Sequence, residues 1–120
     1  MKTVLIADDA LFMRMMLKDL LTMNNLHVVG EAEDGAEAVD KFRKLRPDLV
    51  LLDVLMPNMD GLSAAREILD QDPQARIVML SAMGQSNFLD EARKLGVKNY
   101  ITKPFSPPRV IKTINDVLSQ

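Results

Sequence analysis

The sequence of 120 residues contains no cysteine and a single histidine, His27. Without cysteine the chain can form no disulfide framework, thiolate nucleophile or thiolate zinc site. A single imidazole excludes a multi-histidine metal centre, and it disfavours the Ser-His arrangement of many hydrolases. Any chemistry of this chain must therefore come from carboxylates, hydroxyls and amines.

Long apolar runs and an excess of one charge are also missing. No apolar stretch approaches the ~18 residues of a membrane span, and the first short apolar run meets two aspartates instead of a signal-peptide pattern. The net charge of -2 is too balanced to indicate a nucleic-acid-binding surface. We therefore expect a soluble cytoplasmic protein with neither a membrane nor nucleic acid as a direct partner.

The apolar pattern predicts that strand and helix alternate five times. Short apolar runs indicate strands, and apolar residues three or four positions apart indicate helices. Such an alternation gives a parallel sheet with helices on both faces, so the expected fold class is an α/β, (βα)5 three-layer sandwich. Residues 1–120 are expected to form a single domain, without room for an output domain. The predicted strands are 4–7, 27–31, 49–52, 76–80 and 98–102.

Four local features add detail to this prediction. The strand at 27–31 is the least apolar and is expected nearer an edge of the sheet. Gly61 is expected to allow an unusual backbone turn before the third helix. Most of the nine methionines are expected to fill the core. A polar stripe on the first helix is formed by Arg14, Lys18 and Thr22.

Polar side chains follow four of the five predicted strands. The carboxyl ends of parallel strands meet at one edge of the sheet, where open α/β sheets bind their ligands. We therefore expect these side chains to converge on a divalent cation and a phosphoryl group. They are Asp8 and Asp9 after the first strand, Asp53 after the third, Ser81 after the fourth and Lys103 after the fifth.

The acids have an ordinary explanation as well as a functional one. Asp8 and Asp9 could be acidic residues at a helix start, and Asp53 could be a strand-end turn residue. One acid suffices at a helix start, however, and three neighbouring carboxylates repel one another unless a cation neutralises them. Oxygen-only ligands favour Mg²⁺ or Mn²⁺. Beside such a cation, Asp53 could attack phosphorus and form an aspartyl phosphate.

Ser81 and Lys103 could likewise be an ordinary loop serine and a surface lysine. At strand ends, the hydroxyl could instead donate to one phosphoryl oxygen and the ammonium could pair with another. Proline after Lys103 allows a cis peptide bond that would direct the lysine. Each of these signals is weak alone, but five in this order predict a phosphoryl site.

In these motifs essentially the whole chain resembles the receiver domains of two-component response regulators. It is most similar to the stand-alone receivers of chemotaxis, in the segments 12–18 and 81–85. The resemblance implies a flavodoxin-like fold with strand order 2-1-3-4-5. The matching residues are Asp8-Asp9, Asp53, Met56-Pro57, Gly61, Ser81-Ala82, Tyr100 and Lys103-Pro104-Phe105.

The resemblance implies a role for each acid. Asp53 accepts a phosphoryl group from a histidine kinase of the chemotaxis type. Asp9 and Asp53 bind Mg²⁺ directly, together with the backbone carbonyl of Leu55, while Asp8 acts mainly through water. Leu55 and Met83 are expected to flank the phosphoryl group, and their apolar side chains leave open how fast water reaches it.

The resemblance also implies a route from phosphorylation to output. Ser81 and Lys103 hold the phosphoryl oxygens, and Tyr100 turns inward as Ser81 moves. This reshapes the face of the fourth helix, fifth strand and fifth helix, which would bind a flagellar motor switch protein; a dedicated phosphatase is a further partner. The chain is expected to be a monomer and a phosphoacceptor switch, not an enzyme, which assists its own phosphorylation and dephosphorylation.

Three alternatives remain beside this interpretation. A receiver domain cut from a longer regulator with a DNA-binding or enzymatic output would share all these motifs. An aspartyl-phosphate phosphatase of the haloacid dehalogenase type needs a second acid two residues after the nucleophile, where this chain has Leu55. A flavodoxin-like carrier of FMN needs a hydroxyl- or glycine-rich loop after the first strand, where Asp8 and Asp9 would repel a phosphate.

Overall fold

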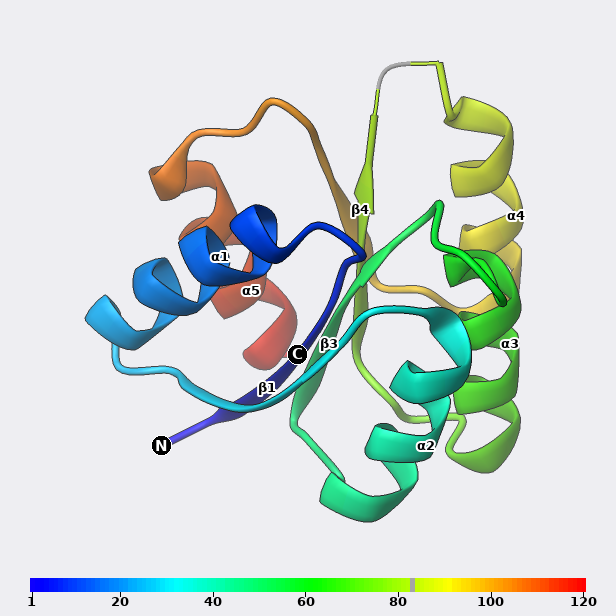
Figure 1. The fold of residues 1–120 in the computed structure, drawn as a ribbon, viewed down its shortest axis with the longest axis horizontal. Coiled ribbons are helices and arrows are strands. Elements are labelled where there is room, and N and C mark those ends of the chain that lie inside the picture. Colours follow the sequence, from blue (N-terminus) through cyan, green and yellow to red (C-terminus); the bar gives the residue numbers. More distant parts are fainter. Residues whose placement is uncertain (83) are drawn as a thin grey trace.

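Five parallel strands form one sheet in the computed structural model, which describes residues 1–82 and 84–120 (Figure 1). The order across the sheet is β2-β1-β3-β4-β5, and a helix follows each strand. This confirms the (βα)5 flavodoxin-like fold and the order 2-1-3-4-5. The strands are β1 (Thr3–Ala7), β2 (His27–Ala32), β3 (Leu49–Asp53), β4 (Ile77–Ser81) and β5 (Asn99–Thr102). The helices are α1 (Leu11–Met23), α2 (Gly35–Leu45), α3 (Gly61–Gln71), α4 (Ser86–Leu95) and α5 (Pro107–Leu118).

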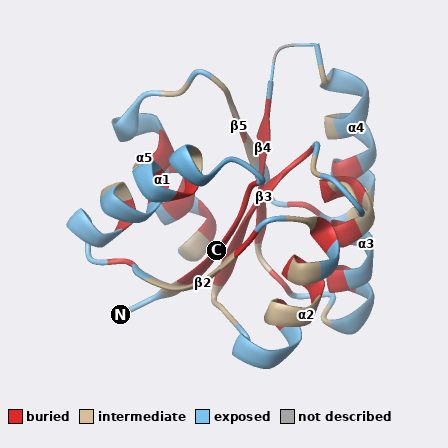
Figure 2. Cartoon of the chain, in the orientation of Figure 1, coloured by how far each residue is buried: buried red, intermediate tan, exposed pale blue. Residues whose placement is uncertain are grey.

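The sheet separates two apolar clusters, because successive side chains of a strand point to opposite faces. Leu5 and Met79 pack on the face covered by α2, α3 and α4, whereas Ile6 and Leu80 pack on the face covered by α1 and α5. β3 and β4 are buried along their whole length, as Figure 2 shows. Burial on both faces explains why these two strands read as continuous apolar runs rather than alternating ones.

β2 lies at one edge of the sheet, as its weaker apolar character predicted. Its side chains are mostly half-buried, and only Ala32 at its end is fully buried. The helix that follows begins where Asp34 accepts a hydrogen bond from the backbone N–H of Glu37, 2.8 Å away. Among residues 1–82 and 84–120, no helix is long and apolar enough to cross a lipid bilayer.

Two expectations from the sequence are wrong. Arg14, expected in a polar stripe of α1, is buried with only 6% of its surface exposed. Only half of the eight described methionines lie in or against the core, namely Met13, Met56, Met59 and Met79, whereas Met15 and Met23 on α1 are 57% and 81% exposed. Apolar spacing alone does not reveal that Arg14 takes a buried position on α1 while Met15 and Met23 stay exposed.

Candidate functional site

The carboxyl ends of β1, β3, β4 and β5 bring the predicted polar residues to one edge of the sheet. Asp8 and Asp9 follow β1, Asp53 ends β3 and pairs in register with Leu80, and Ser81 ends β4. Lys103 follows β5, and its backbone N–H donates to the Ser81 carbonyl at 2.6 Å. The expected convergence is therefore present.

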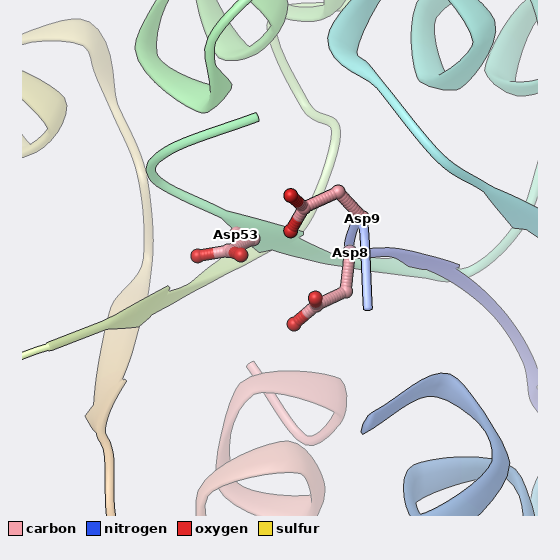
Figure 3. Close-up of side chains that lie close together, drawn as sticks. All are labelled: Asp8, Asp9 and Asp53. Carbon is pink, nitrogen blue, oxygen red and sulfur yellow. The ribbon is translucent and has the colours of Figure 1, made fainter. Parts of the chain in front are cut away.

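Three carboxylates form the centre of this site. One oxygen from each of Asp8, Asp9 and Asp53 lies within 4.8 Å of the others, and Figure 3 shows the three side chains close together at the ends of β1 and β3. Asp8 and Asp53 are buried, while Asp9 is exposed. Oxygen atoms at this spacing, with one side open to solvent, suit a hard divalent cation that keeps part of its water shell.

The charge of Asp53 is costly in this arrangement. Burial and the neighbouring Asp8 carboxylate raise the pKa of Asp53 to about 6, although Lys103 acts in the opposite direction. A cation would relieve the repulsion and stabilise the ionised form. The raised pKa of Asp53 thus follows from the same crowding of carboxylates that suits the cluster to a positively charged ligand.

Lys103 lies between two of the acids. Its Nζ is 3.0 Å from Asp8 Oδ2 and 3.4 Å from Asp53 Oδ2. Burial lowers the pKa of Lys103, but contacts with Asp8 and Asp53 raise it by more, so the ammonium stays charged. The Lys103–Pro104 peptide bond is cis, which the sequence allowed. The two contacts of its ammonium put Lys103 in place to pair with an additional anionic group at Asp53.

The Ser81 hydroxyl is fully buried and finds no hydrogen-bond partner within the described part of the chain. Buried hydroxyls without a partner are rare, because the lost hydrogen bond to water costs free energy. Ser81 ends the strand beside Asp53. A phosphoryl oxygen on Asp53 would give this hydroxyl an acceptor.

Two glycines allow the backbone to close around the site. A Cβ on Gly61 would lie 1.9 Å from the Asp53 carbonyl oxygen, and a Cβ on Gly35 would lie 2.3 Å from the Met59 carbonyl oxygen. Gly61 is therefore needed for a close approach to Asp53, not for a left-handed backbone. Sequence reasoning missed Gly35, because the carbonyl that approaches it comes from another loop.

The remaining predicted residues surround this centre. Leu55 lies two residues beyond β3 and is 52% exposed, and the role of its carbonyl as a metal ligand stays a prediction. Met83 lies outside the described residues. Tyr100 on β5 is half-buried beneath the Arg93 guanidinium, which is 5.0 Å from the ring centroid. Both line a cavity of about 150 Å³ between α4 and β5.

Comparison with known proteins identifies the family of this chain. The family model described as response regulator receiver domain matches residues 4–115. The chain therefore belongs to the response regulator receiver domain family of two-component signalling.

Two curated relatives show that the chain is a CheY-like response regulator. They are the chemotaxis proteins CheY of Thermotoga maritima and of Bacillus subtilis, each 52% identical over 116 residues, which is 97% of this chain and 97% of the relative. A solved complex of CheX, CheY, BeF3 and Mg²⁺ from Borrelia burgdorferi is similar with a TM-score of 0.92 and 33% identity. The match covers 97% of this chain and 88% of the matched chain of that complex.

Proposed function

We propose that this protein is a phosphorylation switch that receives a phosphoryl group on Asp53 from a histidine kinase of the chemotaxis type. The observation that carries the proposal is the group of Asp8, Asp9 and Asp53 with Lys103 between two of them. Phosphoryl transfer needs mainly positioning and charge neutralisation, and these residues offer both. A receiver of this kind binds different partners with and without the phosphoryl group. It is not an enzyme that acts on a separate substrate.

In the proposed transfer, an Asp53 carboxylate oxygen attacks phosphorus, the phosphorus–nitrogen bond of the phosphohistidine breaks, and its electron pair returns to the imidazole. Asp9, Asp53 and the Leu55 carbonyl would hold Mg²⁺, with Asp8 acting through water. The bound ion would neutralise charge shared by the carboxylates and the phosphoryl group. Lys103 pairs with one phosphoryl oxygen, and the buried Ser81 hydroxyl donates to another.

The proposed output surface comprises α4, β5 and α5. Ser81 and Lys103 would contact the phosphoryl group, and their strands lead directly into α4 and α5. Tyr100 lies on β5 and lines the cavity between α4 and β5. We expect a flagellar motor switch protein as the target because the two curated relatives are chemotaxis proteins. A CheX-type partner is a second candidate because the Borrelia relative was solved with CheX. The protein would act as a cytoplasmic monomer.

The test is phosphorylation by acetyl phosphate with Mg²⁺, followed by intact-mass measurement and mapping of the modified residue. The wild type should gain one phosphoryl group, and Asp53→Asn should gain none. Asp70→Asn, which changes an exposed acid of α3, is the matched control and should be labelled like the wild type. Undiminished labelling of Asp53→Asn at another carboxylate would contradict the proposal.

A further inference from the structure

Arg14 of α1 is a buried arginine that reaches two parts of the chain at once. Its side chain is 7% exposed. Nη1 donates to the backbone carbonyl of Asp8 at 2.7 Å, while Nε donates to Glu31 Oε1 at 3.1 Å. Nη2 lies 3.6 Å from Glu33 Oε1. One guanidinium thus joins the end of β1 to the acidic end of β2.

The contact with Asp8 acts on the backbone between the two acids of the candidate cation site. The Asp8 carbonyl belongs to the peptide unit that joins Asp8 to Asp9, and a peptide unit is planar. A hydrogen bond to this carbonyl therefore restrains the direction in which both carboxylates leave the chain. The same loop is held from the other side, because the Asp8 N–H donates to the Ala32 carbonyl at 3.0 Å.

The other end of Arg14 is itself anchored. The Glu31 carboxylate also lies 3.9 Å from Lys18 Nζ, and the Glu31 carbonyl accepts a hydrogen bond from Lys41 on α2. A guanidinium is suited to this task because its planar fork can donate in two directions with fixed geometry. The loop after β1 is thus tied through Arg14 to β2 and α2.

We propose that Arg14 is a positioning residue for the cation site, holding the peptide between Asp8 and Asp9 so that their carboxylates meet that of Asp53. This inference rests on the proposed binding of Mg²⁺. Stability alone explains the arrangement poorly, since exchanging a buried ionic group for apolar atoms often leaves stability unchanged or higher. Groups that orient metal ligands, by contrast, typically change metal affinity when they are removed.

Electrostatics predicts in which direction the loss of the Arg14 charge alone would change the affinity for a cation. Removing a positive charge near three carboxylates makes the local potential more negative, and this alone would strengthen the binding of a cation. Loss of positioning would weaken it. The two effects are opposite, so a weaker affinity in an Arg14 variant cannot be caused by the change in charge.

The experiment compares Mg²⁺ dissociation constants from titration calorimetry, without a phosphodonor, for the wild type and three variants. Arg14→Met should bind Mg²⁺ about tenfold more weakly or worse, the usual scale for a group that orients metal ligands. Arg14→Lys should also bind more weakly, because an ammonium lacks the planar fork. Lys18→Met removes the same charge from the same helix, and it should bind as tightly as the wild type or more tightly.

Each outcome decides one of the two ideas. Affinity in both Arg14 variants equal to that of Lys18→Met would overturn the role of Arg14 but leave the proposed function intact. No binding of Mg²⁺ by the wild type would overturn the magnesium proposal itself. Amide NMR spectra without Mg²⁺ establish that each variant is folded, and if Arg14→Met does not fold, Arg14→Lys decides the question.

Discussion

Asp53 is the residue whose ionisation is most strongly affected by the fold. It is 8% exposed, it ends the central strand, and its pKa is raised to about 6 by burial and by Asp8. Between the ordinary carboxyl pKa of 3.8 and about 6, the folded chain binds more protons at Asp53 than the unfolded chain does. Stability from this group is therefore lost as pH rises through that window.

We predict that Asp53→Asn melts at a higher temperature than the wild type at pH 8 without divalent cations, because the amide avoids a buried charge. The difference should shrink as pH falls below about 6 and disappear near pH 4, where the wild-type carboxyl is protonated. Thermal melts in chelator across this range measure it. A difference of the same size at every pH would show that Asp53 ionisation is not its cause.

Residues at strand ends could be predicted from the sequence, whereas Arg14 could not. Asp8, Asp53 and Lys103 follow apolar runs, and parallel topology then places them at one edge of the sheet. The position of Arg14 depends on its contacts with acids in and just after β2. The spacing of polar residues on α1 does not show which of these polar residues turns inward. Pairing between α1 and β2 becomes visible only when both are placed in space.

At the scale of elements, the start of α3 is fitted against the end of β3. The Gly61 N–H donates to the Val54 carbonyl at 2.7 Å, and the Asp60 side chain caps the helix by accepting from the Ser63 N–H. There is no space for a side chain at Gly61, since a Cβ would overlap the Asp53 carbonyl oxygen. The position of the helix and that of the acceptor are therefore coupled.

Gly61→Ala is therefore predicted to destabilise the protein and to displace Asp53. We expect a loss of about 1–3 kcal/mol or more, the range for inserting an atom into close-packed surroundings, together with slower phosphorylation by acetyl phosphate. Chemical denaturation and labelling rates measure the two effects. Glu67→Ala, an exposed change on the same helix, is the control. Wild-type stability in Gly61→Ala would mean that the backbone yields without cost.

The extents of the strands followed from the sequence to within about one residue, but helix faces were harder to predict. On α4, Phe88 and Leu89 are adjacent apolar residues, and the spacing to Ala92 along a helix fits either of them as the inward-facing residue. In the structure Leu89 packs against the core, while Phe88 is 37% exposed. Two adjacent apolar residues at a helix boundary differ by about 100° in direction, and only the neighbouring strand decides between them.

For the whole molecule, the candidate site lies at the carboxyl edge of the sheet, which separates the two apolar clusters. α1 and α5 cover one face, and α2, α3 and α4 cover the other. β4 ends at Ser81, Lys103 directly follows β5, and the next helices along the chain are α4 and α5. We therefore expect a charge added at Asp53 to affect elements on both faces of the sheet.

We predict that beryllofluoride with Mg²⁺ will shift backbone amide NMR signals of α4, β5 and α5 more than those of α2 and α3. The reason is that Ser81 and Lys103 would adjust to the new oxygens, and an added charge favours one of two arrangements of the elements attached to them. Asp53→Asn under the same conditions should show no such shifts. A response limited to the loop after β3 would leave this output face without a connection to the acceptor.

Tyr100 is the single tyrosine of a chain that contains no tryptophan. Fluorescence excited at wavelengths longer than those that phenylalanine absorbs must therefore come from the Tyr100 ring. This ring lies under Arg93 beside the cavity between α4 and β5. The unmodified protein thus carries its own optical probe at the surface proposed to change. Stopped-flow emission from this ring can follow, without any label, how quickly the output face responds to events at Asp53.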